Sequence, residues 1–119
     1  MALVLHALAM PPIGGMYFRE LTLPVLGKQN VWFYIENQRK AVIEFNGVIN
    51  LKESIAYWQA DDGRLEFEMG TELKRMLTRY RTTLREARYD AKNDRAFVCV
   101  KPPVVPALDI AMHRVRFVT

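Results

Sequence analysis

The chain has 119 residues, half of them hydrophobic and a quarter charged, which fits one compact domain and excludes a disordered or fibrous chain. Its formal net charge is +4, and the basic excess is regional: residues 1–63 carry five basic against six acidic side chains, whereas residues 64–119 carry twelve against seven. The single cysteine, Cys99, cannot form an intramolecular disulfide, so we expect a reducing, cytoplasmic location.

The first 28 residues contain proline and glycine pairs, and we expect an irregular N-terminal segment within a single domain of residues 1–119. Within it, residues 16–23 could form at most a short edge strand. The apolar residues 1–10 are shorter than the roughly 20 residues of a transmembrane helix, and no basic residue precedes them as in a signal peptide. We expect residues 1–10 to pack against the domain or to form a contact in a homo-oligomer.

Residues 31–69 have the pattern of several β-strands. β-branched and aromatic residues predict a strand over 31–36, and two hairpins follow it. Asn46-Gly47 is predicted to form a two-residue turn between strands 41–45 and 48–51, and Asp61-Asp62-Gly63 separates strands 55–60 and 64–69. Apolar and charged residues alternate in the last of these strands, as expected for one face toward the core and one toward water.

At Thr71 the spacing of apolar residues changes to that of a helix. The pattern predicts an amphipathic helix over 71–88 that is capped by Thr71. A competing interpretation is a short helix to about Arg79 followed by a strand, because residues 80–84 have strand propensity and residues 87–100 could form another hairpin. The spacing does not decide between the two.

Strands over 96–100 and 108–118 complete the chain. The total is about seven strands and one helix, with connections too short for parallel crossovers. We therefore predict a β-rich α+β fold, in which a curled antiparallel sheet or small β-barrel packs with one amphipathic helix.

The search for catalytic patterns is mostly negative. With one cysteine and two histidines, the chain has no zinc-binding spacing, and it has no phosphate-binding glycine loop. We therefore predict no catalytic residue, metal or cofactor, and favour a protein that is not an enzyme. Cys99 shares a strand face with Phe97, which favours a core cysteine with a raised pKa. His113 could act as a base or ligand, but the sequence does not show whether it lies beside Cys99.

The aromatic residues lead to the main functional hypothesis. They are more numerous than a tight core of this size needs, and both faces of strand 31–36 look apolar. A curled sheet lined in this way can hold a small apolar or aromatic ligand, so we expect noncatalytic binding of such a ligand within the sheet or barrel. The predicted ligand-binding residues are Trp32, Tyr34, Trp58, Phe67, Tyr80 and His113.

Two alternatives come from other functional classes. One is a single-stranded nucleic-acid-binding module, in which helix arginines contact phosphates and sheet aromatics stack on bases. Its basic residues would be Arg75, Arg79, Arg81, Arg85 and Arg88. The other is a structural or assembly subunit of a homo-oligomer. A closed sheet with a cavity favours the ligand, an open sheet beside the arginines favours nucleic acid, and a dry two-fold contact favours assembly.

Overall fold

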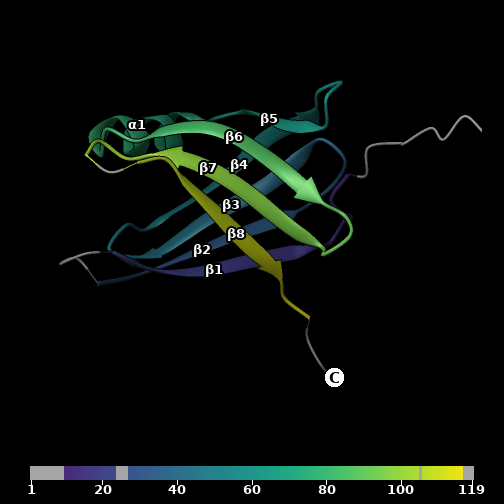
Figure 1. Ribbon diagram of the computed structural model, residues 1–119, viewed down its shortest axis with the longest axis horizontal. Coiled ribbons are helices and arrows are strands. Elements are labelled where there is room, and N and C mark those ends of the chain that lie inside the picture. The colour runs from purple at the N-terminus through teal and green to yellow at the C-terminus, as the bar shows by residue number, and fades with distance from the viewer. Residues whose placement is uncertain (1–9, 24–26, 105, 117–119) are drawn as a thin grey trace, which may run out of the picture.

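The fold is a closed barrel of eight antiparallel strands with one helix (Figure 1). The computed structural model describes residues 10–23, 27–104 and 106–116. Each strand pairs with the next along the chain, and the last pairs with the first. This confirms the predicted β-rich antiparallel class. The elements are β1 (Met16–Leu23), β2 (Gly27–Ile35), β3 (Lys40–Gly47), β4 (Leu51–Gln59), β5 (Arg64–Glu68), α1 (Thr71–Arg79), β6 (Thr83–Asp90), β7 (Arg95–Lys101) and β8 (Leu108–Arg114).

The N-terminal region is more regular than the sequence indicates. The expectation of an irregular segment with at most a short edge strand is wrong for β1, which pairs with β2 from Met16 opposite Tyr34 to Leu23 opposite Gly27. β1 also pairs with β8 at Tyr17 and Phe18, so this part of β1 is no edge strand. A closed barrel supplies such a second partner, which local sequence signals do not report. The apolar residues 1–9 lie outside the described part of the chain.

The first predicted hairpin is present, but its turn differs from the two-residue turn expected. β3 continues through Gly47, and β4 begins only at Leu51, which lies opposite Phe45. Gly47 has φ +139°, and a Cβ atom there would lie 2.5 Å from the carbonyl oxygen of Lys28. The glycine is therefore required for close approach to β2, and not for a type I′ turn. The second hairpin, at Gly63 (φ +91°), is confirmed.

The longer helix interpretation is wrong, and the shorter one is confirmed. α1 ends at Arg79 and Arg81 has φ +51°, so the chain leaves the helix there and enters β6. β6 pairs with β7 along its whole length, with a bulge between Leu84 and Glu86. These strand partners outweigh the helical spacing of the apolar residues, because intrinsic propensity is a weak constraint once tertiary partners are available.

The start of the helix is also capped differently from the expectation. The N-cap residue is Gly70, and no N-cap side chain bonds to the helix. Instead, Glu53 of β4 accepts hydrogen bonds from the backbone N–H groups of Leu73 at 2.8 Å and Glu72 at 3.3 Å. A Cβ at Gly70 would overlap the Glu53 carboxylate. The carboxylate thus binds the positive end of the helix and fixes α1 against β4.

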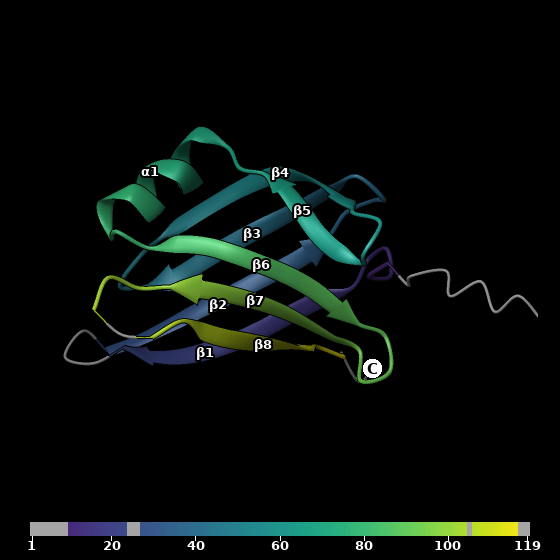
Figure 2. The same ribbon diagram turned by 45° about the horizontal axis from the view of Figure 1, so that its top comes forward.

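The barrel interior is filled by side chains. Buried residues from all eight strands meet there, together with Leu73 of α1, and a cavity of about 40 Å³ lies among them. Figure 2 shows α1 beside β4 on the side of the barrel that it covers. The buried apolar residues are Tyr17, Val31, Phe33, Ile35, Ala41, Ile55, Tyr57, Leu65, Leu73, Ala87, Ala96 and Met112.

Two junctions between strands are much shorter than the others. β5 and β6 face each other only at Arg64 opposite Arg88 and Leu65 opposite Ala87, and α1 packs beside this junction with contacts to β4 and β6. β1 and β8 face each other only at two positions, one of them Phe18 opposite His113. Beyond that position the two strands diverge (Figure 1).

Candidate functional site

The outer wall of β1, β2 and β3 carries a cluster of apolar and aromatic side chains. Cross-strand register places Phe18 opposite Trp32, and it places Tyr34 between Met16 and Val42. These five residues, which we call the aromatic face, alternate along their strands with residues that point into the barrel. The Phe18 and Trp32 rings lie with their centroids 4.4 Å apart. Sheet pairing therefore gathers side chains that are distant in the sequence into one outward patch.

A groove of about 530 Å³ runs over the aromatic face. It is lined by Met16, Trp32, Tyr34 and Val42 together with two charged residues, Glu44 and Lys52. Tyr34 remains 38% exposed.

Glu44 and Lys52 lie opposite each other on β3 and β4. Neither forms an ion pair or hydrogen bond with another described residue. The groove therefore combines an apolar floor with one acid and one base that are available to a partner.

The structure brings together some of the predicted ligand-binding residues. Trp32 and Tyr34 both belong to the aromatic face, and His113 of β8 is exposed next to its edge, opposite Phe18. These three residues share the outer wall, whereas the hypothesis placed them within the sheet or barrel. Met16 and Val42 were not predicted as site residues, although both faces of strand 31–36 already looked apolar in the sequence.

The other three predicted ligand-binding residues lie elsewhere. Trp58 is 50% exposed on the outer wall of β4, opposite Glu66. Phe67 lines the small interior cavity, where its ring meets that of Phe33 edge to face at 5.8 Å. Tyr80 is exposed at the end of α1. The six residues therefore do not line one pocket.

Two of the predicted nucleic-acid-binding arginines share a second groove. Arg75 and Arg79 of α1 line a space of about 240 Å³ together with Tyr80 and the turn between β3 and β4. Arg75 forms an ion pair with Glu72 at 3.4 Å.

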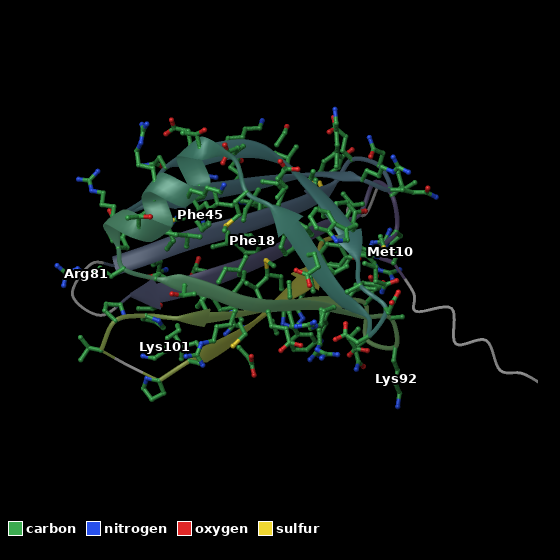
Figure 3. The ribbon with its side chains drawn as sticks, turned by 90° about the horizontal axis from the view of Figure 1, so that it is seen from above. Met10, Phe18, Phe45, Arg81, Lys92 and Lys101 are labelled. Carbon is green, nitrogen blue, oxygen red and sulfur yellow. The ribbon has the colours of Figure 1, made fainter. Side chains whose placement is uncertain are left out.

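The remaining three arginines are spread over neighbouring positions. Arg81 projects from the end of the barrel where α1 ends (Figure 3). Arg85 lies at the bulge of β6, and Arg88 is paired with Glu86. The arginines therefore lie along α1 and β6, on a closed barrel and away from β1, β2 and β3.

Cys99 lies on the outer wall of β7, so its expected place in the core is wrong. Register places it between Glu86 and Asp109 on the neighbouring strands. Partial burial, together with a hydrogen bond to Asp109 and the charge of that carboxylate, raises the pKa of the thiol, which opposes a thiolate role. His113 lies opposite Arg95, four residues from Asp109 along β8, so it does not adjoin Cys99.

A polar cluster that the sequence analysis missed joins three parts of the barrel. Asp94, in the turn between β6 and β7, accepts hydrogen bonds from the hydroxyls of Tyr17 and Tyr89, both at 2.7 Å. Its second oxygen accepts a bond from Arg114 at 3.1 Å, and Arg116 lies 3.6 Å away. This turn, marked by Lys92 in Figure 3, lies at the end of the barrel opposite α1.

The cluster shifts the pKa values of its tyrosine and aspartate groups in opposite directions. Burial and the bond to Asp94 raise the pKa of Tyr17, so its hydroxyl remains a donor. Although burial acts to raise the pKa of Asp94, hydrogen bonds from Tyr89, Tyr17 and Arg114 hold it below the usual value. Asp94 has φ +50°, a conformation that Asp tolerates better than most residues. A charged carboxylate that binds β1, β6 and β8 is suited to closing the barrel.

Chemically reactive groupings are scarce in the part of the chain that the structure describes. No three His, Cys, Asp or Glu side chains there gather closely enough to hold a metal ion. No helix within those same residues combines the length and apolarity needed to cross a membrane. The aromatic face is the strongest candidate for a functional surface because a groove of about 530 Å³ runs over its apolar side chains. Comparisons of the chain with protein-family models, with curated proteins and with solved structures find no match.

Proposed function

We propose that this protein is a noncatalytic assembly subunit that pairs with a second copy of itself through the aromatic face. The observation that carries the proposal is the groove over this face, whose apolar floor is accompanied by the unpaired charges of Glu44 and Lys52. Aromatic residues and methionine are enriched in the centres of protein interfaces. This groove is open to solvent on the outer wall, which suits a second protein surface better than an enclosed small ligand.

Binding of a small apolar ligand inside the barrel has less support. The interior cavity of about 40 Å³ is far smaller than the roughly 300 Å³ at which small-molecule sites begin. Trp32 and Tyr34, which the ligand hypothesis used, lie in the outer groove instead. The ligand hypothesis is thus better tested at that groove than in the core.

The two unpaired charges favour a second copy over other occupants. In a two-fold pair the same surface is used twice, so Glu44 of one copy can meet Lys52 of the other, and the reverse contact forms as well. Glu44 and Lys52 together give the groove no net positive charge to attract the phosphates of a nucleic acid. Rim charges of this kind set orientation more than affinity, and the aromatic side chains supply the apolar contact.

Sedimentation velocity over a wide range of protein concentration tests the proposal. The wild type is expected to form dimers, and Trp32→Glu is expected to remain monomeric, because it places a charge in the apolar floor. Trp58→Glu is the matched control, since Trp58 is a more exposed tryptophan outside the groove, and this variant should dimerise like the wild type. A wild type that is monomeric throughout overturns the proposal.

A charge exchange tests the orientation of the two copies. Glu44→Lys and Lys52→Glu should each weaken the dimer, because each brings like charges together across the interface. The double variant should recover the dimer, since both cross-pairs again have opposite charges. A double variant that dimerises no better than the single variants contradicts the two-fold arrangement.

Single-stranded nucleic-acid binding is a second candidate, at a different place. It is favoured by the groove in which Arg75 and Arg79 lie beside the exposed ring of Tyr80, because arginine and an aromatic ring can bind a phosphate and a base. Fluorescence polarisation of a labelled oligonucleotide across a salt series tests this. Arg79→Gln should weaken salt-sensitive binding, whereas Arg64→Gln, at an arginine paired with Asp62, should not.

A further inference from the structure

The junction between β1 and β8 leaves part of each strand without a neighbour on one side. The strands face each other only at Tyr17 opposite Arg114 and Phe18 opposite His113. In Figure 1, β8 meets β1 only near its own end, and its start lies toward α1 and β7. Residues 19–23 of β1 and 108–112 of β8 therefore have no paired strand across this junction, and we call this unpaired stretch the β1–β8 opening.

Hydrogen-bonding directions show which backbone groups face this opening. The backbone N–H of Val115 donates to the carbonyl of Met16 at 2.7 Å, so odd-numbered residues of β8 point toward β1. Because these directions alternate along a strand, Asp109 and Ala111 direct their N–H and C=O groups into the opening. The even-numbered residues between them point toward β7. The edge of β8 is thus free to pair with another strand.

The side chains at the opening indicate what such a strand must carry. Leu108 is 48% exposed although it lies on the inward side of β8, and Ile110 and Leu21 are half-buried beside the opening. Arg19 is exposed although it lies opposite the buried Val31. It forms no hydrogen bond or ion pair with another described residue. The inward side of the opening therefore offers apolar contacts and one positive charge.

The other short junction, between β5 and β6, is covered by a helix. Beside the β5–β6 junction, α1 places Leu73 in the core with only 4% of its surface exposed. Among the strands, α1 contacts β4 and β6, so the one helix of the described residues lies at the other junction.

We propose that the β1–β8 opening binds an extended peptide segment of a partner protein, which adds a strand antiparallel to β8. Strand addition at a free edge uses backbone hydrogen bonds for affinity and alternate side chains for specificity. The inward side chains of the segment would be acidic near Arg19, followed by apolar ones beside Ile110 and Leu108. Its outward residues would pair with Ala111 and Asp109.

A synthetic peptide tests this arrangement with the full chain. The probe is acetyl-Glu-Thr-Val-Thr-Val-Thr-amide, whose glutamate and valines would face inward opposite Met112, Ile110 and Leu108. Amide hydrogen exchange of the free protein should be fast at Asp109 and Ala111 and slow at Ile110, and the peptide should protect the fast amides. Protection of Asp109 and Ala111 without any peptide would overturn the proposal, as would a failure of saturating peptide to slow their exchange.

Two matched peptides separate strand addition from nonspecific apolar binding. N-methylation of the first two threonines removes the N–H groups that would bond to β8, so binding measured by calorimetry should fall at least tenfold. N-methylation of the valines removes N–H groups on the other edge and should leave binding nearly unchanged. Equal affinity of the two methylated peptides would contradict the proposal.

A charge reversal tests the role of Arg19. The wild type should prefer the glutamate peptide over the same peptide with lysine in its place, and Arg19→Glu should reverse that preference. An unchanged preference would overturn the assignment of the acidic position. The variant Trp32→Glu should retain peptide binding, which distinguishes a failure of this proposal from a failure of self-association through the aromatic face.

Discussion

The two short junctions of the barrel are closed in different ways. At the β5–β6 junction, α1 places Leu73 against the core, and Glu53 of β4 binds the start of the helix. At the β1–β8 junction, a polar cluster around Asp94 joins the strands at one end, and the other end is open. The comparison teaches that a barrel can be closed by apolar cover or by a half-buried charge, and that a charge closes only the part of the junction within its reach.

The largest expected effect compares one leucine at each junction. Leu73→Ala should lower the free energy of unfolding by about 3 kcal/mol, because it leaves a cavity beside the core. Leu108→Ala should lower it by less than about 1 kcal/mol, because Leu108 is already half in water. Urea unfolding of both variants measures the difference. Equal losses would show that the two junctions are covered alike.

Removal of the charge that closes the β1–β8 junction should have the next largest effect. Asp94→Gly deletes the acceptor of Tyr17, Tyr89 and Arg114 without straining a backbone that already has positive φ. We expect a loss of about 2 kcal/mol in urea unfolding, because the buried Tyr17 hydroxyl loses its partner. Asn93→Gly in the same turn is the control and should cost much less, since its exposed side chain donates a hydrogen bond to Asp90 at the surface.

Acid should weaken the same cluster. Because the pKa of Asp94 in the folded protein lies below its usual value, its stabilising contribution is present above the unfolded pKa of about 4. The contribution is lost as pH falls through the folded value. The difference in free energy of unfolding between wild type and Asp94→Gly should therefore shrink at low pH. A difference that is constant from neutral to acid pH would contradict the role of the charge.

The helix cap at the covered junction should have a smaller effect. Glu53→Gln keeps the size of the side chain but replaces a carboxylate that accepts two backbone N–H groups of α1. We expect a loss of about 1 kcal/mol in thermal or urea unfolding, which is typical for the loss of a helix cap. Glu68→Gln, at an exposed position of β5, is the control and should leave stability nearly unchanged.

The smallest effect on stability is expected at the open end. Arg19→Ala should change the free energy of unfolding by less than about 0.5 kcal/mol, because the exposed side chain has no partner among the described residues. A much larger loss would show that Arg19 supports the barrel itself. The variant therefore separates a residue available for binding from one required for folding.

Parts of the candidate site could be predicted from the sequence. Both faces of strand 31–36 looked apolar, and Trp32 and Tyr34, which were predicted as binding residues, do lie in one groove. The sequence hypothesis placed both residues around a ligand inside the sheet, but closure of the barrel turns them outward. Phe18 and Met16 were missed because β1 itself was expected to be mostly irregular. The position of a strand in the barrel depends on its pairing partners, and the residue pattern of one strand does not identify those partners.

The sequence by itself determined the antiparallel β-rich class, the β4–β5 hairpin and the start of α1. These depend on local signals: alternation of period two, the Asp62-Gly63 turn and the change to helical spacing at Thr71. Only the tertiary structure decided that residues 83–90 form a strand, that Cys99 faces outward, and that Asp94 binds Tyr17 across 77 positions of the chain. The physical reason is that these outcomes depend on hydrogen-bonding and packing partners supplied by distant strands, which local propensity does not encode.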